Sequence, residues 1–401
     1  MRRILLALVC VSSVAGAQRP RARDLGISEL IGGTPGFLDA ITDVGGVEVG
    51  HTTLIRGDAG PLKVGTGPVR TGVTIVHPRG RNSSDAVFGA WFTLNGNGEM
   101  TGTTWLQEGG FLEGPIGITN THSVGVVRDA ILQWQVGKPG MQPWGLPVVA
   151  ETYDGGLNDI NGFHVKPEHA IAALDGARGG VVPQEGAVGG GTGMVCEGFK
   201  GGIGTASRKL PAAQGGYTVG VLVQCNFGSM RDMRVAGAPV GAELGDLAAC
   251  IGGDAPLQPG RRRCGTPAPR GGGEETEQGS IIVVVATDAP MVPHQLKRIA
   301  TRVALGVGRT GGTGGNGSGD IFIAFSTANP GASVPNDTAR ITMVSNNAIS
   351  PLFSATIQAT EEAILNAMLA ADTMTGANNL RVNALPADRV TAILRKYGRL
   401  K

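Results

Sequence analysis

The junction between Gly279 and Ser280 brings together the two groups that a self-activating nucleophile needs. Residues 252–279, on its left, are rich in Gly, Pro and Arg and offer little that can pack in a core. Residues 280–286, on its right, form an apolar run headed by a hydroxyl. If the bond before Ser280 is cut, its hydroxyl can act as nucleophile and its own free amine as general base. The junction by itself favours a plainer alternative, a surface loop that enters a core strand.

Other polar residues could assist such a nucleophile without a histidine. Ser318 and Asp320 lie two residues apart at the start of an apolar run, so their side chains point to the same side of a strand and can relay a proton. Asn226 follows another apolar strand, and its amide suits a developing oxyanion. Glu151 and Tyr153 complete the group. Each residue alone is equally typical of a turn or a half-buried position.

Several other chemistries lack their signatures in this sequence. The Gly-rich run 306–320 follows a predicted helix and leads into a strand, the reverse of a dinucleotide-binding loop, although its backbone could approach a small substrate. Neither G-x-S-x-G nor H-E-x-x-H is present. The six histidines are scattered, and a Ser-His-Asp triad stays open. We expect neither a cofactor nor a metal.

Composition indicates a globular α/β protein. The chain has 401 residues, 41% of them hydrophobic and 16% charged, and 67 are glycines without a collagen period. The net charge of +2 does not suggest a nucleic-acid partner. That length fits one large domain or two ordinary ones.

The first residues resemble a secretory signal. A positive pair, Arg2-Arg3, precedes the apolar stretch 4–14 and the small residues 15–17, so we expect cleavage after Ala17 and a periplasmic or secreted protein. No further segment looks membrane-spanning.

Four of the five cysteines lie beyond this signal, and export permits disulfides. Cys250 and Cys264 flank a loop and are the plausible pair. Cys196 and Cys225 lie in Gly-rich or apolar surroundings and are predicted to be free and buried.

Apolar patterning interleaves strands and helices, which predicts a layered α/β fold. An extended arm is expected at 19–36. The strands are predicted at 72–77, 90–94, 217–223, 280–286, 320–325 and 340–344. The helices are predicted at 124–134, 296–307, from 350 to before 376, and 386–397. Apolar strands on both sides of the flexible linker 252–279 predict one shared core.

The whole pattern resembles the family of the L-aminopeptidase/D-amino-acid esterase and the β-peptidyl aminopeptidases. The resemblance covers almost everything after the N-terminal arm. The matching stretches are 41–53, 117–125, 148–155, 188–193, 224–228, 279–286 and 317–320. Together they are specific, although no single stretch is.

The resemblance implies an autoprocessed enzyme with an αββα sandwich similar to that of N-terminal-nucleophile hydrolases but differently connected. Its precursor would cut itself at Gly279–Ser280 into an α-subunit (18–279) and a β-subunit (280–401) that share one globular domain. The nucleophile position falls on Ser280, and the Ser-x-acid pair falls on Ser318 and Asp320; some family members carry Glu at the acid position. The oxyanion donor falls on Asn226. The long linker carrying Cys264 departs from the family pattern.

The family's amine-binding acid falls on Glu151, and the tyrosine lining that pocket falls on Tyr153. The implied partners are peptides or amino-acid amides and esters, and the implied assembly is a homo-oligomer of αβ units. An ornithine acetyltransferase-like acyl transferase and a non-catalytic exported binding protein are the alternatives. The sequence leaves open whether L-α, β or D substrates are preferred.

Overall fold

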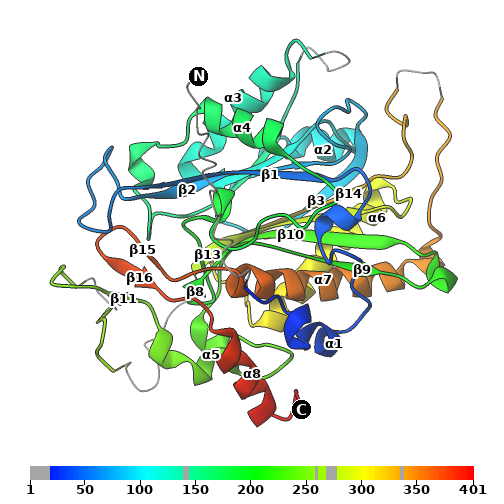
Figure 1. The fold of residues 1–401 in the computed structure, drawn as a ribbon. Coiled ribbons are helices and arrows are strands. Elements are labelled where there is room, and N and C mark those ends of the chain that lie inside the picture. The colour runs from blue at the N-terminus through cyan, green and yellow to red at the C-terminus, as the bar shows by residue number, and fades with distance from the viewer. Residues whose placement is uncertain (1–18, 139–143, 258–260, 268–277, 335–337) are drawn as a thin grey trace, which may run out of the picture.

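Two β-sheets packed face to face form the centre of the molecule. The computed structural model describes residues 19–138, 144–257, 261–267, 278–334 and 338–401 (Figure 1). The small sheet has the order β1-β2-β5-β6, formed by Glu48–Arg56, Val69–His77, Ile116–Asn120 and Val148–Thr152. The large sheet has the order β4-β3-β14-β13-β10-β9, formed by Phe111–Leu112, Val87–Gly96, Gly317–Ser326, Gln278–Thr287, Thr218–Asn226 and Gly202–Lys209.

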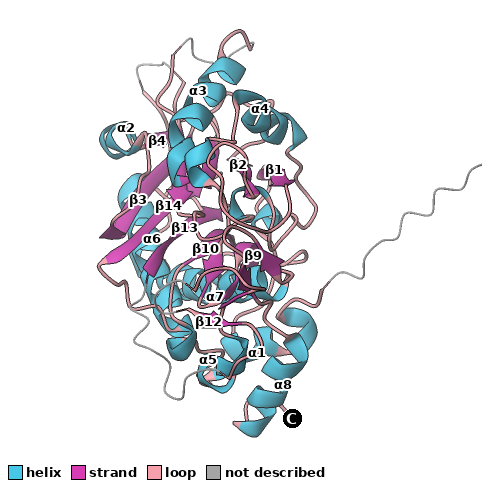
Figure 2. Cartoon of the chain, turned by 90° about the vertical axis from the view of Figure 1, so that its left-hand side faces the viewer, coloured by secondary structure: helices cyan, strands magenta, loops and turns pink. Residues whose placement is uncertain are grey.

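Helices cover the outer face of each sheet, which gives four layers (Figure 2). α3 (Val124–Gln135) and α4 (Pro167–Gly176) pack on the small sheet, and α6 (Pro293–Thr310) and α7 (Ser350–Leu369) pack on the large one. The remaining helices are shorter: α1 (Ile27–Ile31), α2 (Thr103–Gly109), α5 (Val240–Glu243) and α8 (Ala387–Lys396). The α/β prediction is confirmed, and the layers form the expected αββα sandwich.

Strand β13 is the clearest link between sequence and fold. It lies inside the large sheet, parallel to β14 and antiparallel to β10, so both of its faces are buried. Ile282 and Val284 enter the core between the sheets, whereas Ile281 and Val283 enter the core beneath α6 and α7. A continuous apolar run is what a doubly covered strand requires. Because β13 follows the linker and β10 precedes it, the two halves of the chain share one core.

The predicted helices are present with small differences at their ends. The apolar stripe of α6 is buried against the large sheet, and Pro293 begins the helix because its missing N–H is not needed there. The helix ends at Gly311, whose φ is +113°, and a Cβ at this position would overlap the Asp232 carbonyl oxygen. Within the described residues, no helix combines the length and apolarity needed to cross a membrane.

Two local predictions of secondary structure were wrong. Residues 340–344 form no strand; they belong to the segment between β14 and α7, and of these five residues only Val344 is buried. The segment 19–36 is not an extended arm but contains the short helix α1, held in place by buried Arg21. Arg21 pairs with Glu185 at 2.7 Å and donates to backbone carbonyls, so polar contacts, which leave no periodic signal, order this segment.

The linker also contains ordered parts. β12 (Arg262–Arg263) belongs to a third sheet, whose order is β12-β11-β16-β15. Its other strands are β11 (Cys250–Ile251), β16 (Leu380–Val382) and β15 (Met374–Thr375). The Cys250–Cys264 pairing is confirmed, with 5.0 Å between the Cα atoms. Residues 278–279 already belong to β13. Residues 258–260 and 268–277 of the predicted linker lie outside the described residues, as does the predicted signal at 1–17.

Cys196 and Cys225 are not free, which corrects the prediction. They are buried, as expected, but bonded to each other with 5.4 Å between their Cα atoms. Cys196 ends β7 (Val195–Cys196), which forms a small hairpin with β8 (Phe199–Lys200) against β10. Only the folding of this hairpin onto β10 brings together residues 29 positions apart in the sequence.

Candidate active site

Ser280 lies where three strands of the large sheet meet. Its register partners are Asn226 on β10 and Gly319 on β14. The side chain is 5% exposed, and its Oγ accepts a hydrogen bond of 3.1 Å from the Gly319 N–H. The chain is continuous through Gly279, so the nitrogen of Ser280 is here an amide rather than a free amine. The hydroxyl is therefore positioned by the sheet before any cleavage.

Gly279 occupies a position that other residues could not adopt without displacement. Its φ is +103°, in the left-handed region that favours glycine. A Cβ built at this position would lie 1.9 Å from the Asn226 carbonyl oxygen and 3.2 Å from the Asn226 side-chain nitrogen. Glycine thus lets the bond before Ser280 lie against Asn226.

Ser318 and Asp320 form the expected pair on β14. The Ser318 hydroxyl donates to Asp320 Oδ1 at 2.6 Å, and both side chains are buried. Side chains two residues apart on a strand share a face, so Ser318 and Asp320 lie on the same face of β14 as Phe322, which enters the core beneath α6 and α7. By the same rule, Ser280 shares its face with Ile282, which enters the core between the two sheets. The residue before Ser280, Gly279, is the register partner of Ser318.

Asn226 is held by hydrogen bonds on both ends of its amide. Its Nδ2 donates to the Tyr153 carbonyl at 2.9 Å, and its Oδ1 accepts from the Val195 N–H at 2.8 Å. An amide nitrogen carries two donors, so one N–H is left after the bond to Tyr153. These two bonds fix the orientation of the amide, and its remaining N–H is available as the predicted oxyanion donor.

Lys200 supports Asn226 indirectly, a role that the sequence did not suggest. This fully buried side chain donates to the carbonyl oxygens of Met194 and Gly201, both at 2.7 Å. Burial lowers its pKa to about 7. The Lys200 ammonium group thus holds the backbone at Met194 in place. The N–H of the next residue, Val195, donates to the Asn226 side-chain oxygen and so orients that amide.

Glu151 is the second-to-last residue of β6, which packs against β13. The residue is 3% exposed, and its carboxylate accepts hydrogen bonds from the Glu99 N–H at 3.0 Å and from the Thr121 hydroxyl. Burial raises the pKa of this carboxyl above its ordinary value, and the two hydrogen bonds act in the opposite direction. Within the described part of the chain Glu151 forms no ion pair, and a desolvated carboxylate of this kind is suited to receive an ammonium group.

Tyr153 plays two different parts in this geometry. Its backbone carbonyl belongs to the buried network through Asn226, but its ring is 54% exposed. The phenolic oxygen lies at Gly155, where a Cβ would approach it to 2.2 Å. The ring can therefore form part of the rim of the site.

Residues 95–99 were missed as part of the site because Asn-Gly-Asn-Gly is typical of any turn. The Asn97 N–H donates to the Ser318 carbonyl at 3.2 Å, and the Asn97 side chain donates to the Gly317 carbonyl at 2.9 Å. Two residues later, Glu99 donates to Glu151. This turn therefore connects the strand beside Ser280 to the buried carboxylate.

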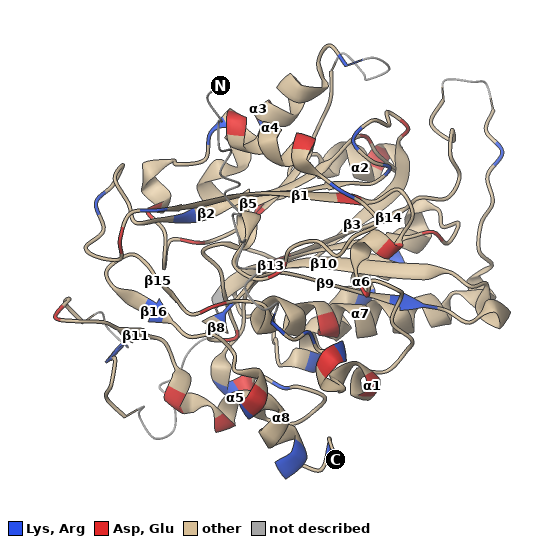
Figure 3. Cartoon of the chain, viewed as in Figure 1, with Lys and Arg blue, Asp and Glu red and all other residues tan. Residues whose placement is uncertain are grey.

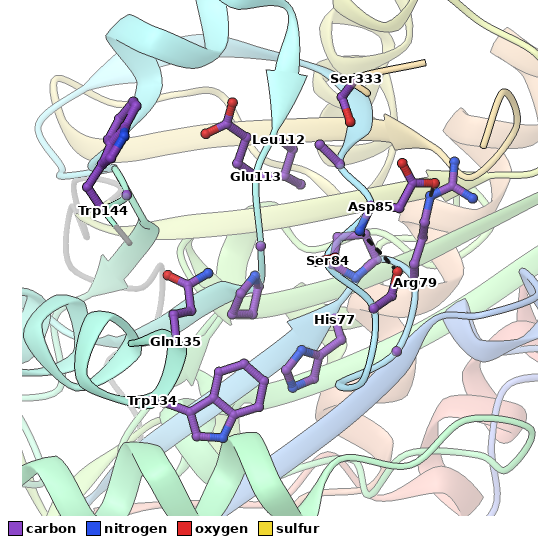
Figure 4. A pocket seen from close by; sticks show the side chains of 17 residues that line it. His77, Arg79, Ser84, Asp85, Leu112, Glu113, Trp134, Gln135, Trp144 and Ser333 are labelled. Carbon is purple, nitrogen blue, oxygen red and sulfur yellow. Dashed lines mark hydrogen bonds and ion pairs between the residues drawn. The ribbon is translucent and has the colours of Figure 1, made fainter. Parts of the chain in front are cut away.

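A separate crevice of about 100 Å³ opens at the other end of the small sheet (Figure 4). His77 and Glu113 line it, with the Arg79–Asp85 ion pair beside them. His77 is the last residue of β2, whose end pairs with the start of β5, whereas Glu151 pairs with Thr119 near the end of β5. The crevice thus lies at the edge opposite the candidate active site. Among the described residues, no cluster of three His, Cys, Asp or Glu could hold a metal.

Charged residues of both signs are spread over helices and loops (Figure 3). The cluster at the end of β13, β14, β10 and β6 is instead composed of buried hydroxyl, amide and carboxylate groups. Groups of these types can support acyl transfer without a histidine.

Comparisons with known proteins agree with this geometry. The pattern of peptidase family S58 matches residues 39–382. The β-peptidyl aminopeptidase BapA of Sphingosinicella microcystinivorans is 54% identical over 397 residues, covering 99% of this chain and 97% of that protein. A Burkholderia sp. β-aminopeptidase superposes with a TM-score of 0.80 at 44% identity, covering 94% of this chain and 99% of the other. The L-aminopeptidase D-Ala-esterase/amidase of Ochrobactrum anthropi, described as a variant of the Ntn-hydrolase fold, gives 0.81 at 42% identity, covering 96% and 100%.

The four layers and the polar strand ends therefore define a hydrolase with an Ntn-like α/β fold. The chain belongs to peptidase family S58 and is an aminopeptidase. The family expected from the sequence is confirmed, and the acetyltransferase and binding-protein alternatives are not favoured.

Proposed function

We propose that the chain is an exported serine aminopeptidase that cuts itself between Gly279 and Ser280 and then uses Ser280 as nucleophile. The observation that carries this proposal is the junction itself. A buried serine follows a glycine whose left-handed φ places the bond between them against Asn226. An ordinary loop entering a strand needs none of these features.

Self-cleavage requires the Ser280 hydroxyl oxygen to attack the Gly279 carbonyl carbon. The carbon–nitrogen bond then breaks, the hydroxyl proton passes to the nitrogen, and an ester joins Gly279 to Ser280 Oγ. Water hydrolyses this ester, which releases the Gly279 carboxylate and restores the hydroxyl. The Asn226 amide, 3.2 Å from where a Gly279 Cβ would lie, is suited to stabilise the oxyanion formed on the Gly279 carbonyl.

The mature enzyme would repeat this acyl transfer on a substrate. The substrate ammonium binds Glu151, and Ser280 Oγ attacks the carbonyl carbon of the N-terminal residue. The Ser280 amine takes the hydroxyl proton, directly or through Ser318 and Asp320, and returns it to the leaving amine. Water then resolves the acyl-enzyme.

The substrates we propose are peptides, amides or esters that begin with a β-amino acid. The support is the likeness to the BapA proteins, which are named β-peptidyl aminopeptidases. Export is supported by the N-terminal segment 1–17 and by the two disulfides, which persist in oxidising compartments. A homo-oligomer of αβ units is proposed from the family resemblance, and light scattering would measure its mass.

Ser280→Ala tests the proposal. The purified variant should run as one uncut chain on a denaturing gel and release no p-nitroaniline from β-alanyl-p-nitroanilide, whereas wild-type protein should give two fragments and activity. Ser345→Ala is a matched control, because Ser345 caps the exposed turn Asn346–Ala348 rather than belonging to the candidate site. Removing the Ser345 hydroxyl should leave self-cleavage intact. Cleavage and activity in the Ser280 variant would exclude it as nucleophile.

A further inference from the structure

The turn of residues 97–99, called here the spacer segment, joins the two ends of the candidate site. At one end, Asn97 is bonded to Ser318 and Gly317 of β14. At the other end, the Glu99 N–H is bonded to Glu151 at 3.0 Å. The nucleophile and the amine-binding carboxylate come from different sheets, and the spacer segment is a short covalent path between them.

Gly98, in the middle of the spacer segment, fills the narrow gap between these ends. A Cβ at this position would lie 3.1 Å from the Gly319 Cα and 3.3 Å from Glu151 Oε1. Gly319 is the residue whose N–H binds Ser280 Oγ. One methyl group on Gly98 would therefore touch the residue that holds the nucleophile and the carboxylate that receives the substrate amine.

The contact is close from both directions, so the gap cannot easily widen on the β14 side. A Cβ on Gly319 would lie 2.5 Å from the Asn97 carbonyl oxygen and 2.7 Å from the Gly98 Cα. β14 is also fixed between β3 and β13. The movable partner is the Glu151 side chain, whose carboxylate must move away if a methyl is added.

We propose that the spacer segment, with Gly98 at its centre, sets the reach between Ser280 and Glu151 and thereby selects how many carbons separate the substrate amine from its scissile carbonyl. An α-aminoacyl substrate has one carbon between these groups, and a β-aminoacyl substrate has two. A displacement of the Glu151 carboxylate therefore favours one of the two substrate lengths over the other. This inference rests on the proposed function of Ser280 and Glu151.

The backbone of Gly98 makes this position testable by a small change. Its φ lies outside the left-handed region, so alanine is not excluded by the backbone conformation. Gly98 is also exposed, as is Gly96 two residues earlier. A Cβ on Gly96 would have only an ordinary contact of 3.8 Å with Thr93, so Gly96→Ala is a matched control in the same turn.

The experiment compares kcat/KM for β-alanyl- and L-alanyl-p-nitroanilide in wild-type protein, Gly98→Ala and Gly96→Ala. Because moving Glu151 away lengthens the reach, Gly98→Ala should raise the β-to-α ratio of kcat/KM by at least about tenfold, the lower end of what one methylene in a pocket discriminates. Gly96→Ala should keep the wild-type ratio. A ratio for Gly98→Ala within twofold of wild type would overturn the inference.

Two further readouts separate the outcomes. Self-cleavage and thermal melting report whether each variant folds, and a wild-type protein that neither cuts itself nor hydrolyses either substrate would contradict the proposed function instead. If Gly98→Ala does not fold, Asn97→Ala decides, because it removes the bond to Gly317 and adds no atoms. That variant should bring the β-to-α ratio at least about threefold closer to one, in keeping with the loss of one positioning contact, and an unchanged ratio would overturn the inference.

Discussion

Replacing Glu151 by glutamine should separate substrate binding from self-cleavage. The buried carboxylate accepts hydrogen bonds from the Glu99 N–H and the Thr121 hydroxyl, and glutamine keeps an oxygen for one of them. What it loses is the charge that would pair with the substrate ammonium. Losing one partner of a buried, hydrogen-bonded charge pair costs about 2–5 kcal/mol. Because glutamine still accepts a hydrogen bond, we expect the lower part of this range, about 2–3 kcal/mol, or a loss of about 30- to 160-fold in kcat/KM.

The assay measures kcat/KM on β-alanyl-p-nitroanilide beside the extent of self-cleavage on a denaturing gel. Cleavage of the Gly279–Ser280 bond involves no free substrate amine, so Glu151→Gln should cut itself like wild type. Unchanged kcat/KM would refute the amine-binding role of Glu151. A parallel loss of self-cleavage would show that the residue acts on the junction rather than on substrate.

The same substitution should remove part of the pH dependence. Burial raises the pKa of Glu151 above its ordinary value of 4.5, so the carboxylate is protonated, and kcat/KM falls, at a higher pH than for an exposed glutamate. The stability contribution of a carboxyl with a raised pKa is present at low pH and lost as pH rises through that pKa. Glu151→Gln should therefore flatten the acid limb of kcat/KM and should not lower the melting temperature at pH 7.

Two more predictions concern the junction and the disulfides. Gly279→Ala should accumulate uncut precursor on a denaturing gel, since its Cβ would overlap the Asn226 carbonyl oxygen, whereas Gly253→Ala, also at positive φ but with open space around it, should be cut normally. Fast cleavage of Gly279→Ala would contradict the packing argument. Removing either disulfide by paired Cys→Ser changes should cost about 3–4 kcal/mol in denaturant unfolding, by loop length. Only loss of Cys196–Cys225, which adjoins Asn226, should also lower kcat; equal effects of both pairs on kcat would contradict this.

Much of the fold could be predicted because burial leaves a period in the sequence. The apolar run 280–286 indicated a strand covered on both faces, and β13 is such a strand. The apolar stripe of α6 gave the helix nearly to its ends. The segments that were mispredicted, 19–36 and 340–344, are positioned by polar contacts or lie exposed, and neither situation produces a hydrophobic period.

The site was predicted as a set of residues rather than as a geometry. Ser280, Asn226, Ser318, Asp320 and Glu151 come from four strands whose ends meet only when the two sheets stack. The sequence contained no sign that Gly98 fills the gap at Glu151. Backbone groups made these connections, and every residue type except proline carries the same N–H and C=O, so the sequence leaves no signal of them.

The sequence by itself determined the groups present at the Gly279–Ser280 junction: a glycine that tolerates positive φ, a hydroxyl next to the bond for which we propose cleavage, and an apolar strand that had to be buried. Tertiary structure decided what surrounds that hydroxyl. Strand register placed Asn226 and Gly319 beside the hydroxyl. Sheet stacking placed Glu151 near Gly319, with Gly98 within contact distance of both. The physical reason is that residue types are local properties, whereas register and stacking depend on how the whole apolar surface is buried at once.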